Sequence, residues 1–152
     1  MKKILLLVLG TALVTAAQAE GISATQTEVM QKLIAGYAEK AKAEAVKAKS
    51  KPVSAVEFSA DIGRQFFLKT RNRDGDEEPA CSACHTEDPR QQGKHVASKK
   101  PIAPLAPVAN ADRYTSPAKV EKNFAQHCEE LYSRDCDATE KGNFLTYLLS
   151  VK

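Results

Sequence analysis

The chain has 152 residues, a formal net charge of +3 and four cysteines. This length predicts a single domain once any targeting segment is removed. The nearly balanced charge gives no general argument for nucleic-acid binding, so any electrostatic recognition has to be local.

The first residues are typical of an export signal. Lys2 and Lys3 form a positive start, an apolar run follows, and the small-residue sequence AQA at 17–19 is a cleavage site. The apolar run is shorter than the roughly 20 residues that span a bilayer, which argues against the alternative of an uncleaved anchor. We therefore expect residues 1–19 to be a signal peptide, cleaved after Ala19, and the mature chain to be periplasmic.

A helical segment is predicted next. Thr25 followed by Glu28 indicates a capping box, and apolar residues then recur at helical spacing. The second half of the segment is rich in Ala, Glu and Lys, which predicts a solvated helix that ends at Pro52. We expect residues 20–52 to be an N-terminal helical extension and residues 53–152 to be the main domain.

The sequence SAVEFSADIGRQFFLKT, residues 54–70, predicts a second helix. Gly63 lies inside it and costs a helix about 1 kcal/mol relative to Ala, which indicates close approach by another backbone. From Thr86 to Ser116 no helical or strand period is visible. Loops this long are uncommon in compact domains unless they are functional or disordered. Because PIAPLAPVA is apolar for a disordered segment, we expect the loop to cover a large apolar cofactor.

Two further helices complete the prediction. Ser116 is the expected N-cap of the first, with Pro117 at its first position. One face of this helix carries Val120, Phe124, His127 and Leu131. Asp137 is the expected N-cap of the last helix. No strand of useful length is visible, so the predicted fold is all-α with long loops.

The strongest motif is CSACH, in which Cys81, Cys84 and His85 spell Cys-x-x-Cys-His. Two thiols at this spacing form thioether bonds to the two vinyl groups of a haem, and the adjacent histidine is brought beneath the iron. We therefore predict one covalently attached haem c, with His85 as the proximal ligand. The alternatives are a redox-active dithiol, which would prefer a strand-to-helix context, and a structural zinc site, which would need further ligands.

A second iron ligand has to come from elsewhere in the chain. Methionine is excluded, because Met30 is the only one after the signal peptide and none follows the haem motif. His95 lies in a polar segment, whereas His127 shares a helical face with apolar residues. We assign His127 as the distal ligand; His95, an Asn, a Lys or an open position are the alternatives.

Cys128 and Cys136 remain once the haem motif is assigned. Export permits disulfides, so we expect these two to form one, with two free thiols as the alternative. Such a bridge would join the end of the His127 helix to the start of the last helix and stabilise the fold by roughly 2–3 kcal/mol.

From about Ile22 to Leu149 the chain resembles the SHP-type (sphaeroides haem protein) cytochromes c. The resemblance is carried by LIAGYA, IGRQFFL, CSACH, PIAPLAP, RYTSPAKVEKNF and HCEELYSRDC. It implies a class I cytochrome c-like fold, with the Gly63 helix crossing the last helix near Tyr147 and Leu148.

The resemblance also implies that the residue before Cys128 faces iron. In the family this is typically a weakly bound Asn that can leave on reduction and open the iron to small diatomic molecules. Here the position is His127, which supports its assignment and weakens the expectation of gas binding. Asn123 stands where the family usually has Trp, and is a fallback ligand.

We therefore expect an electron-transfer cytochrome whose partners are other periplasmic or membrane-bound haem redox proteins. Lys94, Lys99 and Lys100 are a candidate docking patch for an acidic partner, with ordinary solvated lysines as the alternative. The second functional hypothesis is a haem that binds or turns over O2 or NO at a position that opens on reduction. No carboxylate pair or nucleophile–base arrangement points to an enzyme.

Overall fold

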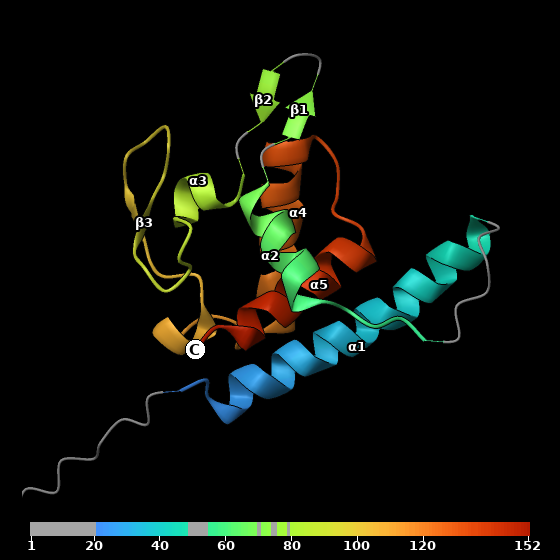
Figure 1. The fold of residues 1–152 in the computed structure, drawn as a ribbon. Coiled ribbons are helices and arrows are strands. Elements are labelled where there is room, and N and C mark those ends of the chain that lie inside the picture. The colour runs from blue at the N-terminus through green and yellow to red at the C-terminus, as the bar shows by residue number, and fades with distance from the viewer. Residues whose placement is uncertain (1–20, 49–54, 70, 74–75, 79) are drawn as a thin grey trace, which may run out of the picture.

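The computed structural model of the protein describes residues 21–48, 55–69, 71–73, 76–78 and 80–152. The expected signal peptide and Pro52 lie outside these ranges. The helices are α1 (Ala24–Lys47), α2 (Ala60–Leu68), α3 (Ser82–His85), α4 (Pro117–Tyr132) and α5 (Ala138–Ser150), with a short 3-10 helix at Pro107–Ala109. Figure 1 shows α2, α4 and α5 gathered together, with α1 running along one side of the group.

The first helix begins earlier than the sequence predicted. Ser23 is the N-cap of α1, and its side chain and that of Gln26 form a reciprocal capping box. The expected box at Thr25 and Glu28 is therefore wrong. Both pairs have suitable spacing, but Gln26 is fully buried and makes further contacts with a distant loop, which fixes the helix start at Ser23.

Much of α1 packs on the rest of the protein. Met30 and Tyr37 are almost fully buried, and α1 contacts α5 extensively and α4 more lightly. The Tyr37 ring meets Phe124 of α4 edge-on at 6.3 Å between centroids. Toward its end the helix projects past the other elements, where Val46 is exposed (Figure 1). Among the described helices, none combines the length and the apolar character that crossing a membrane would require.

Gly63 marks a close crossing between α2 and α5. A Cβ at this position would collide with the backbone carbonyl of Asn143 and lie 2.8 Å from Cβ of Tyr147. The inference that another backbone approaches Gly63 is therefore correct. The helix itself is shorter than expected, because Ser59 is its N-cap and residues 55–59 are not helical.

The segments before α3 and before α4 contain small hairpins rather than plain loops. Strands β1 (Arg71–Arg73) and β2 (Asp76–Glu78) pair antiparallel, as do β3 (Gly93–Lys94) and β4 (Pro101–Ile102). These strands are too short for a periodic pattern to be visible in the sequence. The helix caps at Ser116 and Asp137 are as predicted, and Asp137 forms a capping box with Glu140.

Candidate functional site

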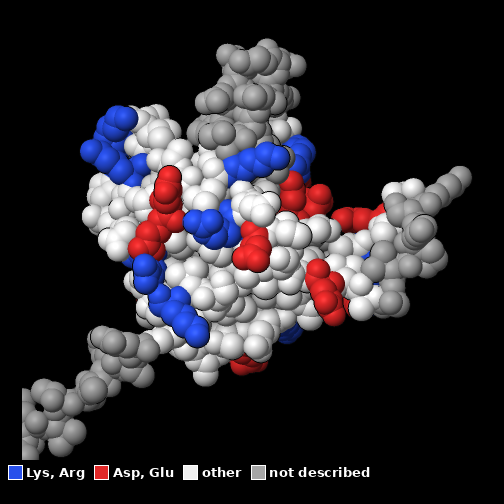
Figure 2. All heavy atoms as spheres, in the orientation of Figure 1, with Lys and Arg blue, Asp and Glu red and all other residues white. Residues whose placement is uncertain are grey.

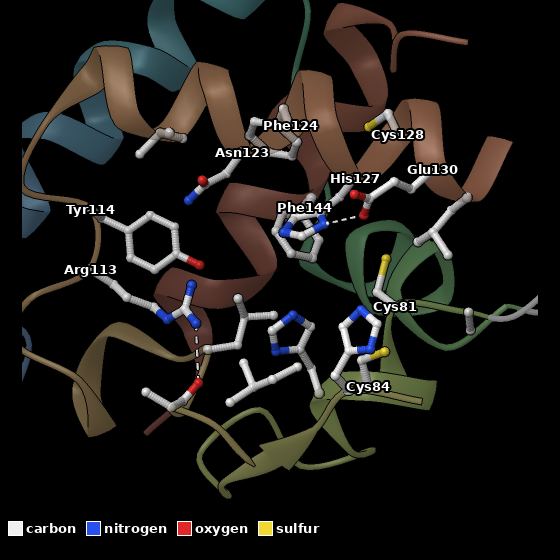
Figure 3. A pocket seen from close by; sticks show the side chains of 18 of the residues that line it. Cys81, Cys84, Arg113, Tyr114, Asn123, Phe124, His127, Cys128, Glu130 and Phe144 are labelled. Atoms are coloured by element: carbon white, nitrogen blue, oxygen red, sulfur yellow. Dashed lines mark hydrogen bonds and ion pairs between the residues drawn. The ribbon is translucent and has the colours of Figure 1, made fainter. Parts of the chain in front are cut away.

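The Cys-x-x-Cys-His motif forms one turn of helix. The backbone N–H of His85 donates to the carbonyl of Cys81 at 3.1 Å, which closes the turn, and Thr86 ends it with φ 60°. Gly93 of β3 lies against this turn, since a Cβ there would collide with the Cys84 carbonyl. The hairpin and α3 are therefore packed backbone to backbone, and both cysteines and the histidine face one cavity (Figure 3).

This cavity has a volume of about 460 Å³, within the range of cofactor pockets. Its walls come from α2, α3, α4, the middle of α5, the β3–β4 hairpin and the loop that precedes α4. Apolar side chains make up much of the lining, among them Phe66, Leu105, Val120, Phe124 and Phe144. The loop from Thr86 to Ser116 thus forms one wall, as expected of a loop that covers a large apolar group.

Two histidines face each other across the cavity. The ring centroids of His85 and His127 are 6.4 Å apart and the ring planes lie at 81°. A metal–imidazole bond is about 2 Å long, so two imidazoles on opposite sides of one iron have centroids about 6 Å apart. The spacing therefore leaves room for an iron between them. Among the described residues, no group of three or more His, Cys, Asp or Glu side chains could hold a metal ion.

His85 is held in the form that binds a metal. Burial lowers its pKa to about 4, and the positive charges of Arg113 and His127 act in the same direction. The imidazole is therefore neutral near pH 7, and neutral imidazole is the metal ligand. Its Nδ1 is buried and has no hydrogen-bond partner among the described residues.

His127 lies at the rim of the cavity. Its side chain is 55% exposed, and Nδ1 is 3.2 Å from Oε2 of Glu130 one turn further along α4. The apolar helix face suggested a more buried position. The contact with Glu130 engages Nδ1 and leaves Nε2 for another partner, the arrangement usual for metal-binding histidines.

The alternative ligands have other surroundings. His95 also lines the cavity, but its Nδ1 accepts hydrogen bonds from the backbone N–H groups of Ala97 and Ser98 at 3.2 and 3.1 Å. Asn123 lines the cavity one turn before His127. Met30 is fully buried in α1 and does not line the cavity.

Cys128 and Cys136 form a disulfide, with Cα atoms 5.6 Å apart. Between them, Ser133 ends α4 in a left-handed conformation with φ 49°. The bridge therefore ties the last turn of α4, next to His127, to the residue before the N-cap of α5.

Sequence reasoning did not identify Glu130, Arg113 or Tyr114 as cavity residues. Arg113 and Tyr114 line the cavity at the end away from Cys81 and Cys84 (Figure 3). They precede the N-cap of α4, and an Arg-Tyr pair before a helix carries no pattern that separates a cavity residue from a surface one. Only the fold of the loop brings them to the site.

Comparison with known proteins agrees with this architecture. The family model described as domain of unknown function DUF1924 matches residues 53–148. Cytochrome c'' of Methylophilus methylotrophus is 41% identical over 88 residues, which are 58% of this chain and 61% of that protein. The cytochrome c-type protein SHP of Cereibacter sphaeroides is 39% identical over 89 residues, 59% of this chain and 68% of that protein.

Solved structures show the same similarity over more of the chain. Oxidised cytochrome c'' from M. methylotrophus superposes with a TM-score of 0.66 and 33% identity, covering 82% of this chain and 96% of that one. Oxidised SHP, described as an oxygen-binding cytochrome c, gives 0.60 and 34%, covering 78% and 94%. The expected all-α cytochrome fold is confirmed. The chain therefore belongs to the DUF1924 family and is an SHP-type cytochrome c, with covalently attached haem c as its cofactor.

Proposed function

We propose that the protein is an exported, periplasmic electron-transfer cytochrome in which Cys81 and Cys84 would hold the haem and His85 and His127 would bind its iron. The observation that carries the proposal is the 6.4 Å separation of the two imidazole rings across the cavity. When bound, the haem supplies a one-electron redox centre. The chain supplies two imidazoles, a largely apolar enclosure and two thiols for covalent attachment.

A fixed pair of imidazoles suits electron transfer. Ligation by both His85 and His127 would leave no ligand to exchange when the oxidation state changes, which would limit rearrangement, and would give a lower potential than His–Met ligation. The disulfide next to His127 and the contact between His127 and Glu130 both restrict movement of the distal imidazole.

The ligand assignment is tested by the visible spectrum of the purified protein. His127→Ala should convert a low-spin, six-coordinate spectrum into a high-spin one, and added imidazole should restore it. His95→Ala is the matched control and should leave the spectrum low-spin. A spectrum that changes with His95→Ala but not with His127→Ala would contradict the assignment.

A second function is favoured by the position of His127. Its side chain is 55% exposed and lies at the cavity rim, so it has space to move away. The Cereibacter relative is described as oxygen-binding, and a solution structure of the Methylophilus protein, with a TM-score of 0.67, is described in terms of haem-ligand detachment. Detachment of His127 on reduction would open a site for O2 or NO. A reduced protein that stays low-spin and does not bind NO would rule this out.

The β3–β4 hairpin is the proposed contact for a redox partner. Residues 89–111 contain no Asp or Glu, and Lys94, Lys99 and Lys100 are all exposed. Positive side chains gather at the corner of the molecule where this hairpin lies (Figure 2, compare Figure 1). Val96 lies between these lysines in the chain, and is both exposed and part of the cavity wall. An acidic haem protein docked here would approach the cofactor closely.

Salt dependence tests this contact. The rate of electron exchange with an acidic haem protein should fall as salt rises, and Lys99→Gln with Lys100→Gln should lower both the rate and its salt dependence. Lys32→Gln with Lys40→Gln, on α1, provides a control of equal charge change. Equal effects of the two pairs would contradict a specific patch.

A further inference from the structure

The two ends of the cavity differ in chemistry. Figure 3 shows the sulfurs of Cys81 and Cys84 at one end, and the guanidinium of Arg113 with the phenol of Tyr114 at the other. His127 lies between them in the same view. A group attached at the sulfur end and reaching past His127 therefore meets a cation and a hydroxyl at its far edge.

Two hydrogen bonds hold the guanidinium of Arg113 in place, and its other N–H donors remain available. Its Nε donates to the Pro104 carbonyl at 2.7 Å and its Nη2 to the Ala103 carbonyl at 3.1 Å. A guanidinium has five N–H donors, so these bonds leave others available. Neither Asp112 nor Glu130, the carboxylates in the cavity lining, forms an ion pair with it, and no described residue does. A half-buried cation of this kind favours an anionic partner.

Tyr114 adds a hydroxyl that has no partner within the described part of the chain. The residue is only 9% exposed, and its phenol oxygen points toward the cavity in Figure 3. Its backbone has φ 58°, a left-handed conformation that is costly for an aromatic residue. A hydroxyl that belongs to a buried residue and is aimed into a cavity from a strained backbone indicates a binding position.

The loop that carries both residues is anchored to α1. The Nε2 of Gln26, which is 1% exposed, donates to the carbonyls of Pro107, Asn110 and Arg113 at 3.3, 2.9 and 3.0 Å. The positions of the guanidinium and the phenol are therefore set before any ligand binds, which lowers the entropy cost of binding.

We propose that Arg113 and Tyr114 bind the propionate carboxylates of the haem, an inference that rests on the proposed attachment at Cys81 and Cys84. A haem carries its vinyl groups on one edge and its two propionates on the opposite edge. Thioether bonds at the sulfur end therefore send the carboxylates toward Arg113 and Tyr114. The guanidinium offsets their charge, and the phenol donates a hydrogen bond to a carboxylate oxygen.

The test compares single variants of the haem-loaded protein. Tyr114→Phe removes only a hydroxyl that has no described partner, so it should preserve the fold. Arg113→Gln removes the charge, and Arg113→Lys keeps it without the planar fork. Lys122→Gln, an exposed cation on α4 that does not line the cavity, is the charge control.

Two readouts are used. Redox-difference infrared spectra with 13C-labelled propionates should show shifted carboxylate bands in Tyr114→Phe and Arg113→Gln, but unchanged bands in Lys122→Gln. The midpoint potential of Arg113→Gln should move to more negative values, because loss of a nearby positive charge favours the ferric state, whereas Arg113→Lys should retain most of the original potential.

Unchanged propionate bands in both Tyr114→Phe and Arg113→Gln would overturn the proposal. If Arg113→Gln does not accumulate as a folded protein, Tyr114→Phe and Arg113→Lys decide the question alone. Absence of covalently bound haem from the wild-type protein would instead contradict the proposed function, so the two failures are distinguishable.

Discussion

Single side chains at the cavity rim decide how firmly the imidazole of His127 is held. His127 is exposed over half of its side-chain surface, and Glu130 is its hydrogen-bond partner within α4. A carboxylate on the nitrogen away from the metal fixes the orientation of a histidine ligand and raises its basicity. The same helix carries Glu129, which is exposed and does not line the cavity.

Glu130→Gln should weaken the hold on His127. The amide is a poorer acceptor than the carboxylate, so a larger high-spin fraction and faster NO binding by the reduced protein are expected. Stopped-flow absorbance measures both. Glu129→Gln changes the charge equally without touching His127 and should behave as wild type; identical effects of the two variants would argue that only net charge matters.

An exposed ion pair close after the haem motif gives a dependence of stability on pH. Hydrogen bonds from Arg90, at 2.9 Å from Nε and 3.0 Å from its backbone N–H, lower the pKa of Asp88 to about 2 from an ordinary 3.8. Because the folded-state pKa is the lower one, the stabilisation is present above about pH 4 and is lost as the pH falls toward 2.

Asp88→Asn should therefore make the free energy of unfolding depend less on pH below about pH 4. The effect should be small, because the pair is exposed to solvent. Urea unfolding at a series of pH values checks this. A wild-type curve as flat as that of the variant would show that the pair contributes nothing.

At the scale of elements, helices α2 and α5 cross so closely that no side chain fits at Gly63. Gly63 meets Asn143 and Tyr147, whereas Gly36 in α1 has no other atom within 4 Å of where its Cβ would lie. These two helical glycines therefore offer a matched pair, since only one of them faces another helix.

Gly63→Ala and Gly36→Ala should change the free energy of unfolding in opposite directions. The first forces the helices apart and should destabilise by about 1–3 kcal/mol. The second improves helix propensity and should stabilise by up to about 1 kcal/mol. Denaturant titration of both variants provides the measurement, and stabilisation by Gly63→Ala would disprove the close crossing.

The disulfide connects two elements that both border the cavity. Replacing Cys128 and Cys136 together by Ser should lower the free energy of unfolding by about 2–3 kcal/mol, by the loop-entropy argument. Because Cys128 adjoins His127, the high-spin fraction should rise as well. Loss of stability with an unchanged spectrum would separate the structural role of the bridge from any role in holding the ligand.

At the scale of the whole molecule, α1 packs against elements that line the cavity. Gln26 connects it to a loop more than 80 residues away in sequence, and Met30 and Tyr37 are buried by its packing. The division at residues 52 and 53 stays a prediction about chain organisation, while the contacts of α1 link it to the loop that carries Arg113.

Gln26→Ala should destabilise the protein by about 1–3 kcal/mol, because it removes the buried amide that donates to the carbonyls of Pro107, Asn110 and Arg113. It should also broaden the propionate infrared bands if the loop loses its anchor. Gln31→Ala, at an exposed position of α1, is the control and should be close to neutral. Equal stability of the two variants would show that the loop does not depend on Gln26.

The sequence alone determined the features that depend on local spacing. The Cys81–His85 motif is one turn of helix, and the caps at Ser116 and Asp137 are local hydrogen bonds. A glycine inside a helix, such as Gly63, indicates that another backbone comes close, whichever element provides it. The candidate His127 followed from a helical face and from the absence of a suitable Met. Each of these signals is contained in a few neighbouring residues.

Only the tertiary structure decided the features that join distant segments. The start of α1 at Ser23 depends on Gln26 meeting a far loop, and the half-exposed position of His127 depends on what packs beside α4. Arg113 and Tyr114 reach the cavity because their loop folds back over it, in a backbone conformation that no local preference favours. Local propensity does not contain this information, because contacts remote in sequence outweigh it.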